Sequence, residues 1–317
     1  FEPQHLVGVH GPPMSGTDEI TAAVTDARDA LQFIWDQTVR GLNRGLTDGE
    51  LVEFVQLPAV FDRSHLTQQH YGLAEHHVRQ IRGGLIGWFD GDEARLLPLP
   101  TVERCRRLVE GFGGREEVAR RVREALRADD LRWALELASW LVRSEVGEDG
   151  RADGGSVEER ALLASVLRTI SQRTMAANLR GWCLTRALEL EGSIDVARHR
   201  VHRFGRRQVL AGSPEILIHS LRVLLDPERA MGVNFHLRWR VTDGPTTGLW
   251  VRNHVAVPTD GLGAGAEVAL SHESLADLLC CRFTFSDAVA EGLVVLSGDV
   301  SAAVTMLNCF DLPSLAS

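Results

Sequence analysis

Two short stretches of this sequence carry side chains whose types and spacing could do chemistry. In the first, His10 follows an apolar run, residues 6–9, and precedes the turn Gly11-Pro12-Pro13. A strand that ends in a histidine and turns through Gly-Pro-Pro presents an imidazole at a sheet edge on a rigid backbone. Neutral imidazole is the commonest metal ligand in proteins, but one histidine is not a metal site. His10 is therefore a candidate ligand whose partner ligands would have to lie elsewhere.

The second stretch contains Tyr71, the only tyrosine of the chain, and Arg79, about two helical turns further on. The phenol could donate a hydrogen bond to an anionic group; alternatively, Tyr71 is half-buried between helices. His76 and His77 lie between them. On a helix these two side chains would point about 100° apart and would not chelate one ion together. A partly exposed polar edge is the simpler interpretation of the pair.

Composition and motifs exclude several classes of protein. The 317 residues are 44% hydrophobic and 24% charged, as in a globular chain with room for two or three domains. The net charge of −9 argues against general nucleic-acid binding, and no apolar run approaches the roughly 20 residues of a transmembrane helix. Five scattered cysteines without a C-x-x-C pair favour buried thiols. No G-x-S-x-G, phosphate-loop, G-x-G-x-x-G or H-E-x-x-H motif is present, and the compartment, cytoplasmic or exported, stays open.

The region from residue 17 to about 190 shows helical periodicity throughout. Apolar residues recur at threes and fours from Ile20 to Leu42, and Thr47 opens a capping-box pattern for a shorter helix through Val55. Further helices are predicted over 65–89, from 101 to the Gly113-Gly114 pair, around 118–126 and 131–141, and over 157–170 and 174–190. Such paired helices suggest tetratricopeptide-like hairpins, although no clean 34-residue repeat is present. Their apolar faces exceed what one thin layer can bury, which predicts a helix-mediated homodimer.

The pattern changes after residue 213. Ser213-Pro214 opens a helix through Leu225, and residues 233–242 then alternate between apolar and polar side chains, as in a strand with one buried face. Further elements are predicted as strands at 248–257, 266–270 and 293–297 and as helices near 272–281, 286–291 and 300–309. The last third is therefore α+β, whereas the middle is all α. This domain could enclose an apolar ligand, but its alternating strand equally fits a plain core face.

Five stretches occur in an order that is typical of one family. They are HGPP (10–13), IWDQTVRGLNRG (34–45), QHYGLAEHHVRQI…GWFDGD (69–92), LPLPTVERCRRLVEGFGG (97–114) and DDLRWALELASWLV (129–142). Together they resemble the C-terminal two-thirds of alkyl sulfatases of the metallo-β-lactamase superfamily. The alternating strand and the helices after it resemble that family's sterol-carrier-protein-2-like domain. No single motif is decisive, but the ordered set is fairly specific.

The resemblance implies a multidomain chain. Residues 1–16 would be the remnant of an αββα metallo-β-lactamase domain, and 17–191 an all-α dimerisation domain. After a linker at 192–212, residues 213–317 would form an α+β sterol-carrier-protein-2-like domain that offers an apolar surface to an alkyl chain. The linker is rich in arginine and histidine, which fits a solvated basic connector or, alternatively, an anion-attracting patch.

The resemblance also implies a chemistry, the hydrolysis of an alkyl sulfate ester to an alcohol and inorganic sulfate. Two zinc ions would orient the ester and activate water, and His10 would be the last of their ligands. Tyr71, His76 and Arg79 would be weaker candidates for the wall of the substrate pocket. At Leu85 relatives often carry an aromatic residue that is associated with the sulfate pocket, so the preference for alkyl sulfates over another ester stays open.

The family's main ligand motif, H-x-H-x-D-H, is absent from these 317 residues, and so are the acidic ligands that should follow it. We therefore expect this chain by itself to bind zinc poorly and to hydrolyse no sulfate ester. Two alternatives remain: a non-catalytic module for lipid binding and dimerisation, and a metallo-β-lactamase-fold hydrolase that acts on a different ester.

Overall fold

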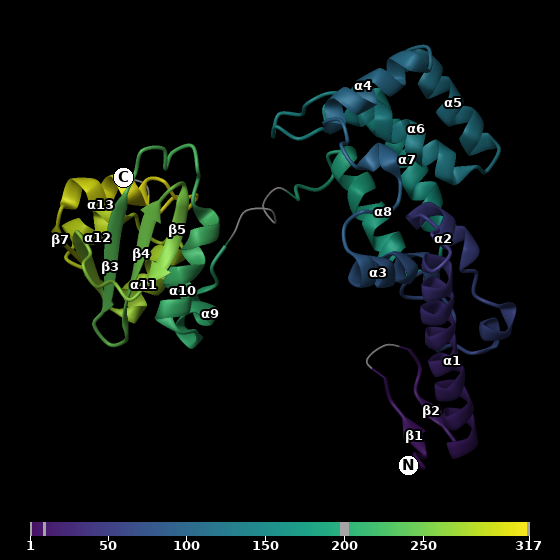
Figure 1. The fold of residues 1–317 in the computed structure, drawn as a ribbon, viewed down its shortest axis with the longest axis horizontal. Coiled ribbons are helices and arrows are strands. Elements are labelled where there is room, and N and C mark those ends of the chain that lie inside the picture. The colour runs from purple at the N-terminus through teal and green to yellow at the C-terminus, as the bar shows by residue number, and fades with distance from the viewer. Residues whose placement is uncertain (1, 9–10, 197–202, 316–317) are drawn as a thin grey trace. The chain divides into compact units, whose positions relative to one another are not determined.

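The computed structural model describes residues 2–8, 11–196 and 203–315 (Figure 1). The chain forms two compact units, Phe1–Val196 and Ala197–Ser317, and each is described by itself. Unit 1 is helical and unit 2 combines helices with a mixed sheet, as the change of sequence pattern predicts. Within the described ranges, no helix is both long enough and apolar enough to cross a membrane.

Unit 1 begins with two short strands beside a long helix (Figure 1). Strands β1 (His5–Leu6) and β2 (Met14–Ser15) pair antiparallel, and both contact α1 (Thr17–Leu42). The later elements are α2 (Asp48–Phe54), η1 (Ala59–Arg63), α3 (Ala74–Ile86), η2 (Glu93–Arg95), α4 (Thr101–Gly111), α5 (Arg115–Arg127), α6 (Leu131–Arg143), α7 (Val157–Arg173) and α8 (Ala177–Leu190).

Local signals fix where several of these helices begin and end. The hydroxyl of Thr47 accepts a hydrogen bond from the amide of Glu50, and the Glu50 carboxylate accepts one from the Thr47 amide at 2.8 Å. The predicted capping box of α2 is thus confirmed. Gly113 and Gly114 separate α4 from α5 with φ angles of +97° and +93°, a region that favours glycine.

Two hydrophobic clusters hold unit 1 together. Ile34, Leu51 and Val78 lie at the centre of the first, which packs α1, α2 and α3 against one another. The second joins α4 to α8 and includes the rings of Phe112 and Trp140, whose centroids lie 5.0 Å apart in an edge-to-face contact. The first cluster positions α3 and therefore His76 and Arg79.

An ion pair links α5, α6 and α7 at the edge of the second cluster. The guanidinium of Arg115 donates to both carboxylate oxygens of Glu159, at 2.8 and 2.5 Å, and to Ser144 Oγ at 2.9 Å. The Glu159 side chain is only 11% exposed. The hydrogen bonds to Glu159 raise the pKa of Arg115, which keeps the guanidinium charged. Removing the guanidinium would leave a largely buried carboxylate without its counter-ion.

Replacing Arg115 by methionine should therefore lower the free energy of unfolding of the chain by about 2 kcal/mol. Arg107→Met is the matched control, because Arg107 forms an exposed pair with Glu103 within α4 and should change stability by less than about 0.5 kcal/mol. Denaturant unfolding followed by circular dichroism measures both. Equal effects of the two substitutions would contradict the structural role of Arg115.

The opening strand is shorter than predicted. It ends at Leu6, where pairing with β2 stops, and Val7 is 79% exposed instead of buried in a sheet. Val9 and His10 lie outside the described residues. In the described part of this segment, the paired strand therefore ends before the apolar run does.

The helix predicted over 65–89 is confined to α3, which begins at Ala74. Before it, the buried hydroxyl of Thr67 donates to the carbonyl oxygens of Phe61 and Ser64, and such bonds compete with helical ones. After it, Gly87 has a φ of +85° and ends the helix. A turn-rich segment thus replaces the first third of the predicted helix.

Unit 2 is built on a five-stranded sheet in the order β5-β4-β3-β6-β7 (Figure 1). Only the β3–β6 pair is parallel among these strands. The strands are β3 (Phe235–Val241), β4 (Thr246–Arg252), β5 (Val255–Thr259), β6 (Ala266–Leu270) and β7 (Val294–Gly298). The helices are α9 (Arg206–Ala211), α10 (Pro214–Ser220), η4 (Leu221–Leu224), α11 (His272–Leu279), α12 (Phe285–Ala290) and α13 (Val300–Leu307).

The alternation in β3 is confirmed, because Leu237, Trp239 and Val241 are at most 2% exposed and belong to the core of unit 2. The strand predicted over 248–257 is wrong in one respect. It is a hairpin of β4 and β5, turned at Asn253 and His254 with φ angles of +49° and +62°. The turn was hidden because apolar residues continue on both sides of it.

Residues 206–211, which the sequence analysis places in the linker, form helix α9. Val209 of α9 is 1% exposed in the core of unit 2, and the guanidinium of Arg206 lies 2.7 Å from a carboxylate oxygen of Asp277 on α11. Part of the basic character of this segment therefore serves a local ion pair. The basic residues at 198–200 and 202 lie outside the described residues.

One histidine of unit 2, His236, has a lowered pKa. His236 on β3 stacks on Trp250 of β4 with ring centroids 5.5 Å apart, and its Nε2 lies 2.7 Å from Thr259 Oγ1. Burial, helped by the positive charge of Arg238, lowers the pKa of His236, while Asp260 opposes the shift.

The imidazole of His236 should therefore titrate below its usual value of about 6.5 in the folded chain. As the pH falls below about 6.5, the unfolded state binds this proton first, so the contribution of His236 to stability is present above that pH and is lost below it. A histidine NMR titration of the chain, assigned with His236→Gln, measures the midpoint. A midpoint above 6.5 would contradict the burial effect.

Candidate functional site

Two histidines that the sequence analysis did not select lie beside the Gly-Pro-Pro turn. His65 and His70 have ring centroids 4.8 Å apart, and His70 Nε2 lies 2.5 Å from Gln68 Oε1. The buried Thr67 between them fixes the turn of the backbone that brings the rings together. The turn-rich segment 64–73 therefore presents two imidazoles on one local structure.

Gly11 connects this segment to the predicted metal ligand. It has a φ of +94°, and a Cβ atom built on it would lie 2.8 Å from His65 Nε2. The residue that follows His10 is thus in close contact with His65, and only glycine leaves room for that approach. His10 itself lies outside the described residues, so its role as a ligand stays a prediction.

Tyr71 is anchored by its backbone and not by burial. The carbonyl oxygen of Tyr71 accepts a hydrogen bond from the amide of Asn178 at 3.1 Å, and that of His70 accepts one from the amide of Ala177 at 2.7 Å. Tyr71 is 56% exposed, so it is half-covered by its neighbours and not enclosed. Its substrate-binding role stays a prediction.

The predicted residues of α3 have separate neighbours. His76 Nε2 lies 3.6 Å from Glu75 Oε1, and its ring faces that of Trp182 on α8 at 6.0 Å. Arg79 Nε lies 3.3 Å from a carboxylate oxygen of Asp48 on α2. His77 instead turns back towards Gly72, with its Nε2 3.1 Å from the position of a Cβ there.

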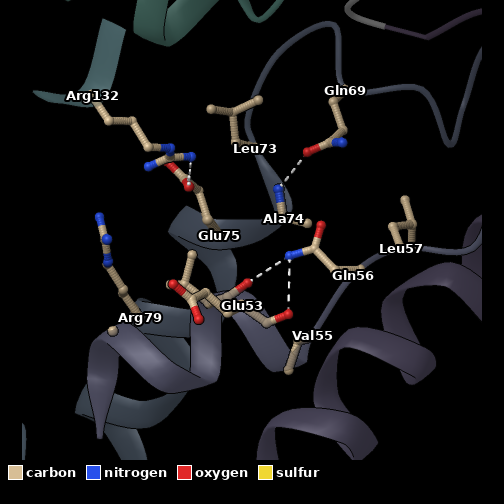
Figure 2. Close-up of a pocket in the computed structure, with 12 residues that line it drawn as sticks. Glu53, Val55, Gln56, Leu57, Gln69, Leu73, Ala74, Glu75, Arg79 and Arg132 are labelled. Atoms are coloured by element: carbon tan, nitrogen blue, oxygen red, sulfur yellow. Dashed lines mark hydrogen bonds and ion pairs between the residues drawn. The ribbon is translucent and has the colours of Figure 1, made fainter. Parts of the chain in front are cut away.

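Arg79 also lines a pocket of about 600 Å³ between α2, α3 and the first turn of α6. Figure 2 shows Arg79 and Arg132 on one side of this pocket and Gln56 and Leu57 on another. Arg132 forms an ion pair with Glu75 across 2.7 Å. The remaining walls mix apolar and polar side chains: Gly49, Val52, Glu53, Val55, Gln69, Leu73 and Ala74. The volume is in the range of small-molecule sites. Tyr71 and His76 are not among the residues that line this pocket.

The described residues do not by themselves fit a metal ion. Over 2–8, 11–196 and 203–315, no three His, Cys, Asp or Glu side chains are placed to hold one ion together. His65 and His70 supply two imidazoles, one ligand fewer than the three that such a group needs. A metal centre at this place would need His10 and further ligands.

Sequence reasoning missed His65, His70 and Trp182. One signal for the histidines was present, because four of the twelve histidines of the chain fall between residues 65 and 77. Nothing in the sequence indicates that Trp182, which is 66% exposed, lies beside His76, since the contact joins α3 to α8.

Comparison with known proteins gives this architecture a family. Residues 47–193 match the alkyl sulfatase dimerisation domain, and residues 205–316 match the alkyl sulfatase C-terminal domain. The first match lies in the helical unit and the second in the α+β unit, so the two units correspond to these two domains in the same order. Over these residues the chain belongs to the alkyl sulfatase family.

Individual relatives agree with this assignment. The chain is 32% identical to a linear primary-alkylsulfatase of Pseudomonas sp. (strain ATCC 19151), over 98% of this chain and 60% of that protein. It is 29% identical to an (R)-specific secondary-alkylsulfatase of Pseudomonas sp, over 93% of this chain and 43% of that protein. The solved structure of the inverting sec-alkylsulfatase Pisa1 from Pseudomonas sp. matches with a TM-score of 0.82 and 27% identity, over 97% of this chain and 48% of that one. The chain thus spans about half the length of the relatives it matches.

Gly11→Ala should displace the imidazole of His65, because the added methyl group would lie 2.8 Å from its Nε2 and the backbone would be strained at φ +94°. Gly45→Ala is the control: its φ of +75° is also positive, but a Cβ there would meet nothing within 4 Å. Histidine NMR spectra should show shifts at His65 and His70 for the first variant alone. Unchanged His65 signals in Gly11→Ala would refute the contact.

Proposed function

We propose that this chain is the dimerisation and C-terminal region of an alkyl sulfatase, an enzyme that hydrolyses an alkyl sulfate to an alcohol and inorganic sulfate. The observation that carries the proposal is the match to alkyl sulfatases along 97% of the chain, in fold and in domain order. In the complete protein, residues 1–16 would close an αββα metallo-β-lactamase domain that holds two zinc ions.

His10 would be the last zinc ligand of that domain. The contact of Gly11 with His65 supports a polar site at this turn, because it brings two further imidazoles close to the backbone of residue 10. Zinc bound there would supply a Lewis acid to orient the ester and activate water. The described residues supply too few donors to hold zinc alone, so the other ligands would come from outside them.

The substrate-pocket roles of Tyr71, His76 and Arg79 rest on their setting. Tyr71 is partly exposed and lies directly after His70, and Arg79 carries its charge at the edge of the pocket in Figure 2. Trp182 adds an exposed aromatic surface beside His76. A phenol, a guanidinium and apolar walls are suited to an anionic head group with a hydrocarbon chain.

Unit 2 would be the sterol-carrier-protein-2-like domain that accepts the apolar chain, and the helical hairpins of unit 1, of tetratricopeptide-like form, would form the homodimer. The interior of unit 2 is well filled: Leu237, Trp239 and Leu249 are at most 1% exposed. A chain would therefore bind on a surface of this unit or after its core has opened.

A second candidate function keeps the same architecture without catalysis, as a lipid-binding and dimerisation module. A third keeps the catalytic fold and changes the ester. The aliphatic and half-exposed Leu85, near the end of α3, is the feature that favours the third over an alkyl sulfatase of unchanged pocket.

Zinc-dependent release of sulfate from dodecyl sulfate separates these functions. We expect none from the 317-residue chain, and release from a chain that includes the upstream zinc domain. In that longer chain His10→Ala should lower kcat/KM by about 100-fold or more, since a ligand is removed. His77→Ala, an exposed histidine that faces Gly72, is the control and should stay near wild type.

The other possible results of this assay either contradict the expected division of zinc ligands or select one of the two alternative functions. Zinc-dependent sulfate release by the 317 residues alone would contradict the expected division of ligands. Cleavage of another ester class, but not of alkyl sulfates, by the longer chain would select the third function. Displacement of a fluorescent lipid without any hydrolysis would select the second.

A further inference from the structure

The helices of unit 2 pack on one face of its sheet. Their buried side chains form a single core with Leu237 and Trp239 of β3 and Leu249 of β4. Side chains of a strand alternate between its two faces, so the residues between these core positions lie on the opposite face, which we call the outer face. On β3 and β4 this face carries His236, Arg238, Arg240, Trp250 and Arg252.

The centre of the outer face is basic. Glu267 of β6 is the one carboxylate at an outer position of the five strands, all of which are described, and two guanidinium groups share it. Arg240 Nε lies 2.8 Å from Glu267 Oε1, and Arg238 Nη1 lies 3.6 Å from Oε2. Asp260, in the loop after β5, adds a second carboxylate at this face. With Arg252, three positive charges face two negative ones, on a chain whose net charge is −9.

Apolar side chains flank this basic centre. Strands β5 and β7 are the two edges of the sheet, and their outer residues Val255 and Val295 are 52% and 59% exposed. The half-buried ring of Trp250 lies on β4, inside one of these edges. Its centroid is 5.5 Å from that of His236 and 4.3 Å from the guanidinium carbon of Arg252. The outer face thus combines arginine, an indole and exposed valines on one sheet surface.

Charge and polarity together indicate what this face can bind. Anionic head groups complement its arginines, whereas hydrocarbon complements its valines, and a layer of anionic amphiphiles offers both. Arginine and tryptophan suit such a boundary, because each has an apolar body and a polar end. A nucleic acid fits less well, since it requires basic side chains along its whole path and the valines interrupt that path at both edges.

We propose that the outer face of unit 2, centred on Arg240, Trp250 and Arg252, binds the surface of anionic lipid or amphiphile layers. The proposed function gives unit 2 a single apolar chain, whereas this face would contact many head groups at once. The binding requires no hydrolysis, so it can be measured whether or not the proposed function holds.

Co-sedimentation with lipid vesicles tests the outer face. The 317-residue chain should bind vesicles of phosphatidylglycerol mixed with phosphatidylcholine but not vesicles of phosphatidylcholine alone, and added salt should weaken the binding. Arg240→Gln/Arg252→Gln should raise the lipid concentration at half-maximal binding by about 10-fold or more. Arg207→Gln/Arg222→Gln removes the same charge from exposed positions on α9 and η4 and should stay near wild type. Circular dichroism checks that both pairs of substitutions leave the fold unchanged.

Trp250 gives a second measurement, which does not depend on removing charge. Phosphatidylglycerol brominated in the acyl chain near the head group should quench part of the tryptophan fluorescence of the wild type, because the indole would lie at the lipid boundary. That part should be absent in Trp250→Phe, which keeps an aromatic ring. Trp35→Phe, at a 47% exposed position of unit 1, should retain it.

Either measurement can overturn the proposal. A wild-type chain that binds neither kind of vesicle, or both equally well, would contradict an anion-binding face. Binding that survives Arg240→Gln/Arg252→Gln, or that falls as much in Arg207→Gln/Arg222→Gln, would assign the interaction to another part of the chain. Quenching that persists unchanged in Trp250→Phe would show that the outer face does not contact the lipid.

Discussion

The hydrogen bonds between segment 64–73 and the N-terminus of α8 are the constraint on which unit 1 depends. The first amides of a helix have no partner within it, and those of Ala177 and Asn178 donate to the carbonyl oxygens of His70 and Tyr71. This link joins the end of the second hydrophobic cluster to the turn before α3. It therefore sets where the histidines, Tyr71 and the beginning of α3 lie relative to Trp182.

Segment 64–73 places polar side chains on a turn between helices. The hydroxyl of Thr67 donates to backbone carbonyl oxygens, so the chain turns instead of continuing as a helix. The turn brings the rings of His65 and His70 into contact. Because the turn is short, Arg79 on the following helix stays near enough to α2 to pair with Asp48 and line the pocket. Functional groups on turns held by rigid helices are a common arrangement in enzymes.

Several large apolar side chains of unit 1 are exposed. The chain itself is about half as long as the relatives it matches. Trp35, Trp88, Leu97 and Trp182 are all exposed, between 47% and 93%. Large exposed apolar patches are typical of interaction sites. Unit 2, by contrast, has a closed core around its sheet.

The sequence by itself determined the order of the helices, the change to α+β near residue 213, the caps and the alternation of β3, since these are set by periodicity and by contacts within a few residues. The family was also visible in the order of its motifs. The turn at 253–254, the turns before α3 and the helix at 206–211 were decided by tertiary contacts. The same holds for the meeting of Gly11 with His65, and of His76 with Trp182. These residues lie far apart along the chain, and only the packing of whole helices brings them within reach.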